Sequence, residues 1–290
     1  MSAQRIVRVG PAQAITTLRE AVRRASDGDV IEIDAATYRR DGATFTQRDL
    51  TIRGVNGRPR FDADGTSEEG KGIIVARGGR LVVENLELAN CRVADENGAG
   101  IRHEAGALVV ANVIFRNNEN GILSGNDERA SVEIRDSQFI ENGHGDGYSH
   151  NLYVGRVGRL IVRSSYFTRA RVGHLLKSRA RVSVIEYNRL TDEPSGTASY
   201  EIDLPDGGIG IVTGNLIEQS ATTENSTIIA FGAEGLGQWP TNRLYLSHNT
   251  VVNHRPAGCT FVSTREGSAA HLSNNLFVGP NCRMAFGGPA

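Results

Sequence analysis

Three short segments of this 290-residue chain align without gaps and carry side chains that could do acid–base chemistry. They read His150-Asn151-Leu152-Tyr153-Val154, His174-Leu175-Leu176-Lys177-Ser178 and Tyr200-Glu201-Ile202-Asp203-Leu204. Side chains alternate between the two faces of a strand, so the residues that follow an inward leucine or isoleucine point outward. The alignment therefore predicts an outer row of Tyr153, Lys177 and Asp203 on three neighbouring strands.

This row, with Arg179 further along its strand, suits an extended acidic glycan. In β-elimination from a uronate polymer, a base removes the proton beside the carboxylate, a cation stabilises the developing charge and an acid protonates the leaving oxygen. We expect Lys177 to be the base, Arg179 the carboxylate partner and Tyr153 the acid, with C5 epimerisation as the related reaction. The protonation of Lys177 stays open, because Asp203 and Glu201 favour its charged form whereas Arg179 and burial favour the neutral one.

Further candidates for substrate binding lie at the starts of the same segments and in one insertion. The first group is His150, Asn151, Tyr200 and Glu201, of which Asn151 and Glu201 are expected on the outer face. His150 and the equivalent His174 are expected to point into the coil, where histidines stacked in the core are commoner than histidines that bind a ligand. The insertion over residues 231–240 contains Trp239, the only tryptophan, which could stack on a sugar ring or pin the loop to the body.

Two alternatives stay open for the same face. Hydrolysis needs two carboxylates roughly 5–10 Å apart, and Glu201 with Asp203 forms the nearest pair, which Asp146 or Asp206 could supplement. The outward charges could instead form a solvated ladder of weak ion pairs. In that case the chain would be a non-catalytic module that binds glycan or serves in assembly.

These segments are positioned by a repeat that runs along most of the chain. Its unit is apolar-x-apolar-polar-Asn/Asp-x-x-apolar, as in residues 82–88, 109–115 and 133–139. The anchors are Asn85, Asn112, Asp136, Ser164, Tyr187, Gly214, His248 and Asn274, which lie 27, 24, 28, 23, 27, 34 and 26 residues apart. Such a period is typical of a solenoid, whose units bury their apolar faces only by stacking. Short apolar runs broken by Gly, Asn, Asp and Ser favour parallel strands about 4.8 Å apart, and the three asparagine anchors predict an internal ladder at a turn.

The N-terminal region predicts a cap for this solenoid. Residues 15–25 place apolar side chains at helical spacing, and Ser26-Asp27-Gly28-Asp29 breaks the pattern. A strand over 30–33, Tyr38 and a strand over 50–54 follow. This order resembles the N-terminal entry of right-handed parallel β-helix proteins of the pectate-lyase-like superfamily, and the resemblance spans about residues 15–277.

The repeat continues without a Pro/Ser-rich linker, which predicts one domain over residues 1–290. The resemblance implies that this domain is an all-β, right-handed parallel β-helix of about nine turns with a cap helix. It also implies polysaccharide chemistry, because enzymes of this superfamily use Lys or Arg on a face of the helix. Their calcium-binding acidic cluster is not evident here, although Glu201, Asp203 and Asp206 could form a weak Ca²⁺ site. The adjacent Asp pairs of β-helix polygalacturonases are missing, which ranks hydrolysis below elimination.

Charge and composition limit the classes of partner that the chain is expected to bind. A net charge of −1, from 32 basic and 33 acidic residues mixed along the chain, argues against a nucleic-acid partner, and no apolar run has membrane length. Buried free thiols in stacked positions are the favoured interpretation for Cys91, Cys259 and Cys282, although Cys259 and Cys282 fall about one turn apart and could meet. Related β-helix proteins that handle polysaccharides are mostly exported. We therefore expect a periplasmic or extracellular location with the leader absent from this chain, while a cytoplasmic location and the oligomeric state stay open.

Overall fold

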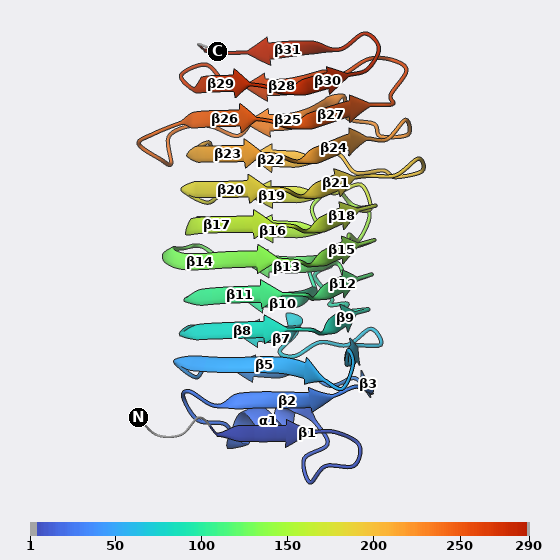
Figure 1. The fold of residues 1–290 in the computed structure, drawn as a ribbon, viewed down its shortest axis with the longest axis vertical. Helices are drawn as coiled ribbons and strands as arrows, with labels where there is room; N and C mark the ends of the chain where they lie inside the picture. The colour runs from blue at the N-terminus through green and yellow to red at the C-terminus, as the bar shows by residue number, and fades with distance from the viewer. Residues whose placement is uncertain (1–4, 289–290) are drawn as a thin grey trace.

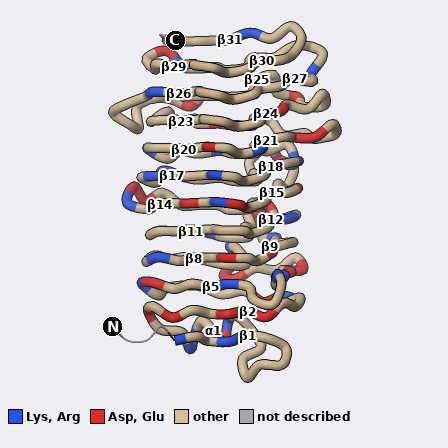
Figure 2. The backbone as a smooth tube through the Cα atoms, viewed as in Figure 1, with Lys and Arg blue, Asp and Glu red and all other residues tan. Residues whose placement is uncertain are grey.

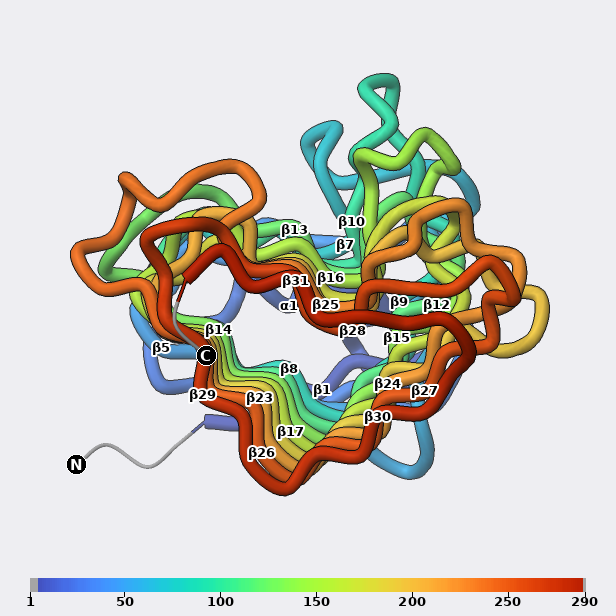
Figure 3. Tube along the Cα trace, turned by 90° about the horizontal axis from the view of Figure 1, so that it is seen from above, coloured from blue at the N-terminus to red at the C-terminus, as the bar shows by residue number. Residues whose placement is uncertain are grey.

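The chain winds into a column of parallel strands in the computed structural model, which describes residues 5–288 (Figure 1). Three parallel sheets form its walls, and each strand pairs with the strands one turn earlier and one turn later. Seen from above, the chain runs counterclockwise as it rises toward the viewer from the N-terminal to the C-terminal end (Figure 3). The coil is therefore right-handed, as predicted.

The three sheets and the single helix among the described residues have the following bounds. The helix is α1 (Leu18–Arg24). Sheet A contains β1 (Ile6–Val9), β2 (Val30–Asp34), β5 (Asp49–Val55), β8 (Arg80–Glu84), β11 (Ala107–Ala111), β14 (Asp127–Arg135), β17 (Val157–Arg163), β20 (Val182–Glu186), β23 (Ile209–Thr213), β26 (Arg243–Ser247) and β29 (Ala269–Ser273). Sheet B contains β3 (Thr37–Arg39), β6 (Arg60–Asp62), β9 (Glu87–Ala89), β12 (Ile114–Arg116), β15 (Gln138–Ile140), β18 (Tyr166–Thr168), β21 (Arg189–Thr191), β24 (Leu216–Gln219), β27 (Thr250–Asn253) and β30 (Leu276–Val278). Sheet C contains β4 (Ala43–Phe45), β7 (Gly72–Ala76), β10 (Ala99–His103), β13 (Asn120–Ser124), β16 (Leu152–Val154), β19 (Leu176–Ser178), β22 (Ile202–Leu204), β25 (Thr227–Phe231), β28 (Thr260–Thr264) and β31 (Arg283–Phe286).

The coil has about ten turns, one more than the repeat predicted, because sheets B and C each contain ten strands. The first recognisable anchor is Asn85, whereas sheet B already contains β3 and β6 before that residue. The earliest turns keep the apolar strands but not the anchor phrase. Acidic and basic residues are interspersed over the whole column (Figure 2).

The cap helix α1 covers the N-terminal end of the column, as predicted, but is shorter at both ends. A carboxylate oxygen of Asp41 accepts a hydrogen bond from the Leu18 amide at 2.6 Å, which satisfies a free donor in the first helical turn. Ile15 instead bridges to Val9, and Ala25 has extended backbone as the C-cap. The apolar residues at helical spacing cover residues 15–25, whereas the helix itself covers only Leu18–Arg24.

The repeat anchors are the corners between sheets A and B. All eight adopt left-handed backbone with φ between 49° and 69°. Glycine reaches this conformation without steric cost, and asparagine and aspartate reach it more easily than other side chains. The recurring Asn or Asp in the sequence phrase is thus a backbone requirement of the corner.

The prediction that Asn85, Asn112 and Asn274 form an internal ladder is wrong, although a ladder of other asparagines forms one residue after the anchors in the later turns. Asn112 donates to Asn85 at 3.2 Å on the outside of the corner, where Asn112 is exposed. The buried ladder links the side chains of Asn188, Asn215, Asn249 and Asn275 at 3.1, 3.0 and 2.9 Å. The left-handed anchor turns the chain, so that the residue after it points into the coil.

Stacked side chains fill the interior. Phe115, Phe139 and Phe167 are fully buried, with successive ring centroids 4.6 and 4.5 Å apart. Cys259 and Cys282 form a disulfide in the last turns, so the favoured interpretation as free thiols is wrong for these two residues, whereas Cys91 is a buried free thiol as predicted. Within residues 5–288, no helix reaches the length and apolarity of a membrane span.

Candidate functional site

Sheet C carries the predicted row of polar residues. Tyr153 on β16 is the register partner of Lys177 on β19, which is in turn the partner of Asp203 on β22. The leucine or isoleucine before each of them is fully buried inside the coil. The predicted register is therefore confirmed, and residues from distant parts of the chain form one patch.

Ion pairs and an aromatic ring connect the members of this patch. Lys177 Nζ lies 3.3 Å from Asp203 Oδ2, and the Arg179 guanidinium contacts Asp206. Arg179 also donates through Nε to the Tyr153 hydroxyl oxygen at 2.9 Å. The Tyr153 ring centroid lies 5.9 Å from Lys177 Nζ and 5.8 Å from Arg179 Cζ. Two cations and a phenol thus touch on one wall.

The loop after β25 lies over this patch and adds a residue that the sequence analysis missed. Glu234 places Oε1 3.0 Å from Lys177 Nζ and Oε2 2.6 Å from an Arg179 terminal nitrogen. The insertion that lengthens one repeat to 34 residues was the only sequence signal for this contact. Lys177 and Arg179 each contact two carboxylates as a result, one from the wall and one from the loop.

Trp239 belongs to the same loop, and of its two predicted roles sugar stacking is wrong and pinning of the loop to the body is confirmed. Its side chain is buried, and its indole Nε1 donates to the Arg179 carbonyl at 3.2 Å. Burial of a large apolar ring with its one polar group satisfied is the usual way a tryptophan fixes a loop. Trp239 therefore anchors the loop beside the patch.

His150 and His174 stack beneath the row, as the inward prediction implied. Their ring centroids are 4.4 Å apart, and their outer edges contact Tyr153 and Tyr200. His150 Nδ1 accepts a hydrogen bond from the His174 amide. Burial and the nearby charge of Lys177 lower the pKa of His174 to about 3, and burial lowers the pKa of His150 well below its ordinary value. Both rings are buried, which is incompatible with direct substrate contact by His150, whereas His174 Nε2 lies 3.5 Å from Asp203 Oδ2 and Tyr200 remains partly exposed.

The prediction that Asn151 and Glu201 face outward is wrong, because both are fully buried. Asn151 accepts from the Asn142 side chain at 2.8 Å and donates to the Thr168 carbonyl at 2.9 Å, in a second buried ladder. Strands β16, β19 and β22 are only three residues long, so alternation does not extend to the residue before each strand. At that position the chain still belongs to the corner and points inward.

Burial also decides the charge of the acidic residues. Neither carboxylate oxygen of Glu201 has a hydrogen-bond partner among residues 5–288, and burial raises its pKa well above the ordinary value. Burial raises the pKa of Asp203 to about 6, against the opposing effect of Lys177. The two side chains do not share a face, so the carboxylate pair considered for hydrolysis is not formed.

The acidic cluster considered for Ca²⁺ is also not assembled. Asp206 is occupied by Arg179 and by Arg156, whose Nε lies 2.7 Å away, and Glu201 lies inside the coil. Asp146 caps a turn by accepting from the Tyr148 amide. In the part of the chain that the structure describes, no three His, Cys, Asp or Glu side chains form a group able to hold a metal ion.

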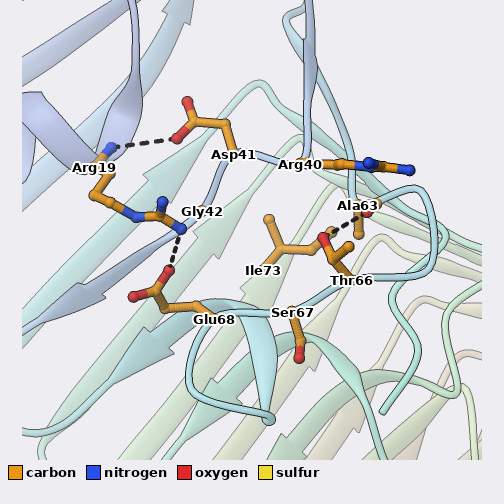
Figure 4. Close-up of a pocket in the computed structure, with 9 residues that line it drawn as sticks. All are labelled: Arg19, Arg40, Asp41, Gly42, Ala63, Thr66, Ser67, Glu68 and Ile73. Atoms are coloured by element: carbon orange, nitrogen blue, oxygen red, sulfur yellow. Dashed lines mark hydrogen bonds and ion pairs between the residues drawn. The ribbon is translucent and has the colours of Figure 1, made fainter.

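A separate pocket of about 230 Å³ lies beside the N-terminal cap (Figure 4). Arg19 closes one side by pairing with Glu68 at 2.7 Å, and Asp41 is used by the backbone of α1. Its polar groups therefore hold the cap onto the first turns. The pocket lies in the first turns of the coil, away from the Lys177 patch.

Comparison with known proteins supports the fold. No protein-family model and no curated protein sequence matches the chain. A mutant of the PL6 family alginate lyase AlyGC is 16% identical with a TM-score of 0.59, over 95% of this chain and 40% of that one. The pectate lyase Pel9A is 12% identical with a TM-score of 0.58, over 100% and 79%, and ORF18 of Geobacillus virus E2 is 12% identical with a TM-score of 0.56, over 94% and 58%. The chain thus spans less than half of the alginate lyase, and the predicted likeness to pectate-lyase-like β-helix proteins is confirmed for the fold.

Proposed function

We propose that this chain is a carbohydrate-active β-helix enzyme that cleaves an acidic, uronate-containing glycan by β-elimination, or inverts it at C5. The observation that carries the proposal is the contact between Lys177, Tyr153 and Arg179 on the outer face of sheet C. The names of two structures with a similar fold, an alginate lyase and a pectate lyase, support it. A polysaccharide partner and an exported location belong to the same proposal.

The choice of lysine at position 177 favours a chemical role over a simple ion pair. Lys71 and Lys177 are the only two lysines among the 32 basic residues of the chain. Most other ion pairs on the outside of the coil use arginine, as in the pair of Arg163 with Glu186, and Lys71 with Glu104 is an exception. Arginine remains protonated in proteins, whereas lysine can lose its proton and act as a base.

The patch supplies one group for each part of the reaction. Lys177 as the free amine takes the C5 proton, and Arg179 neutralises the carboxylate whose charge increases as that proton leaves. The bond from C4 to its oxygen then breaks, a C4–C5 double bond forms and Tyr153 protonates the departing oxygen. Because Arg179 donates to the Tyr153 oxygen, the phenol hydrogen stays available for this step. In epimerisation, a proton returns to C5 from the opposite face instead.

A second candidate function is glycan binding without catalysis. It is favoured by the ion pairing of the patch, because Lys177 and Arg179 are each neutralised by carboxylates in place. Lys177 and Arg179 could bind an acidic glycan by exchanging a carboxylate of the protein for a carboxylate of the glycan, with no proton transfer. The two functions make different demands on Lys177, since binding needs only its charge.

The substitution Lys177→Arg separates the two functions. It keeps a cation between Asp203 and Glu234 but removes the base, so turnover should fall by about 10²–10⁴-fold while glycan binding is retained. The assay records ultraviolet absorbance of the unsaturated product from polygalacturonate, polymannuronate and polyguluronate. Deuterium incorporation at C5 in heavy water detects epimerisation. Lys71→Arg is the matched control, because Lys71 also pairs with a carboxylate, that of Glu104, away from the patch.

Each outcome discriminates between the candidates. Product formation by the wild type and by Lys71→Arg, but not by Lys177→Arg, supports the enzyme. Equal turnover by Lys177→Arg would exclude Lys177 as the base. Binding of uronate polymers with neither unsaturated product nor deuterium incorporation would establish the binding module in place of the enzyme.

A further inference from the structure

Glu234 is the outermost carboxylate of the Lys177 patch. Side-chain exposure is 12% for Lys177 and 14% for Arg179, but 48% for Glu234. The wall carboxylates Asp203 and Asp206 are only 3% and 5% exposed. Glu234 is therefore the group that lies between the two cations and solvent.

The way Glu234 binds is the way a free carboxylate would bind. One oxygen lies 3.0 Å from Lys177 Nζ and the other lies 2.6 Å from an Arg179 nitrogen, so the carboxylate bridges the two cations. Lys177 and Arg179 lower the pKa of Glu234 despite partial burial, so the bridging group is ionised at neutral pH. A uronate carboxylate has the same charge and the same two oxygens.

The loop does not depend on this side chain for its position. The Glu234 amide donates to the Pro205 carbonyl at 3.0 Å, and the Gly232 amide donates to the Leu204 carbonyl at 2.8 Å. Trp239 holds the other side of the loop by its bond to the Arg179 carbonyl. The carboxylate can thus rotate into solvent while the loop backbone stays in place.

Charge balance gives the reason for another anion to enter. The patch contains three cations, Lys177, Arg179 and Arg156, and two wall carboxylates, Asp203 and Asp206. Glu234 supplies the third negative charge. When Glu234 leaves, the wall retains one uncompensated positive charge, which matches one carboxylate of a uronate residue.

We infer that Glu234 occupies the subsite for the substrate carboxylate as an internal stand-in, and that a uronate group binds by displacing it from Lys177 and Arg179. This inference rests on the proposed function, because it assigns the ligand of the same patch. Arg179 then holds the uronate carboxylate, and Lys177 loses the contact with Glu234, as its role as the base requires. Specificity for a carboxylate over a neutral sugar follows, since only an anion can replace the bridging group.

The test compares uronate binding by the wild type and by Glu234→Gln. Trigalacturonate and its uncharged methyl ester are titrated against each protein by calorimetry. The amide cannot bridge two cations, so trigalacturonate should bind about tenfold more tightly to Glu234→Gln, whereas the ester should bind both proteins equally. Glu266→Gln, an exposed glutamate in the next turn, is the matched control and should leave both affinities unchanged.

Two results would overturn the inference. One is unchanged or weaker trigalacturonate binding by Glu234→Gln, and the other is an equal gain for the ester, which would indicate simple opening of the loop. A measurement on the wild type does not depend on the variant folding. The ¹³C signal of the Glu234 carboxylate should move toward its free-solution value as trigalacturonate is added, and a signal that stays in place contradicts displacement.

These measurements record binding alone, so they separate this inference from the proposed reaction. Tighter uronate binding by Glu234→Gln without any product would support the displacement of Glu234 and contradict the proposed enzyme activity. Product formation by the wild type, with no effect of Glu234→Gln on uronate binding, would support the enzyme activity and contradict the displacement of Glu234.

Discussion

Replacing Asp192 by asparagine should remove a loss of stability that the wild-type chain undergoes as the pH rises. Asp192 is fully buried, and its Oδ2 accepts from the Ala198 amide at 2.8 Å. Its Oδ1 has no hydrogen-bond partner among the described residues. Burial raises the pKa of Asp192 to about 7, against the opposing hydrogen bond from Ala198. Asparagine keeps an acceptor for Ala198 and cannot ionise.

The sign and size of the effect follow from the two pKa values. Since the pKa of Asp192 is about 7 in the folded chain and 3.8 for an unperturbed aspartate, the folded chain keeps a proton that the unfolded chain has lost. Asp192 contributes its full stabilisation when the pH is below the pKa of an unperturbed aspartate. This stabilisation is lost as the pH rises through the pKa of Asp192 in the folded chain. One pKa unit corresponds to about 1.36 kcal/mol, so this group should lower the free energy of unfolding by about 3 kcal/mol between pH 5 and pH 8.

Urea denaturation at pH 5 and pH 8 measures this change. The free energy of unfolding of Asp192→Asn, taken relative to that of the wild type, should be about 3 kcal/mol higher at pH 8 than at pH 5. Asp136→Asn is the control, because Asp136 is exposed at a left-handed corner that asparagine also adopts. A difference that is the same at both pH values would refute the reasoning, since it would mean that Asp192 is already ionised in the folded chain at pH 5.

Two further predictions concern the interior and the C-terminal turns. Phe139→Ala should cost about 3–5 kcal/mol in the free energy of unfolding, because Phe139 lies between the rings of Phe115 and Phe167, and Phe139→Leu should cost much less. Denaturation curves test this, and equal losses for both variants would mean that ring volume is not the cause. Cys282→Ser should cost about 3 kcal/mol through the lost cross-link to Cys259, 23 residues away. Hydrogen exchange should accelerate first in β28 and β31, and a reductant should destabilise the wild type but not the variant; a uniform change across the column would contradict this.

The sequence determined the architecture and the central row of the patch, because both depend on periodic patterns. A left-handed corner recurs at each anchor, so residues such as Asn85 and Asp136 mark the turns, and a known turn length places neighbouring strands side by side. Within a strand, alternation is a local rule. This rule places Tyr153, Lys177 and Asp203 in one row on neighbouring strands, and the register of the sheet confirms it.

The tertiary structure decided where side chains lie in the segments that follow no regular pattern. Alternation failed for Asn151 and Glu201, because a three-residue strand leaves the preceding residue in the corner, where the chain points inward. Glu234 and Trp239 lie in a loop without periodicity, so only packing against the wall shows that one bridges two cations and the other is buried. Repeating backbone geometry can be read from spacing, whereas the path of an irregular loop depends on contacts with residues far away in the chain.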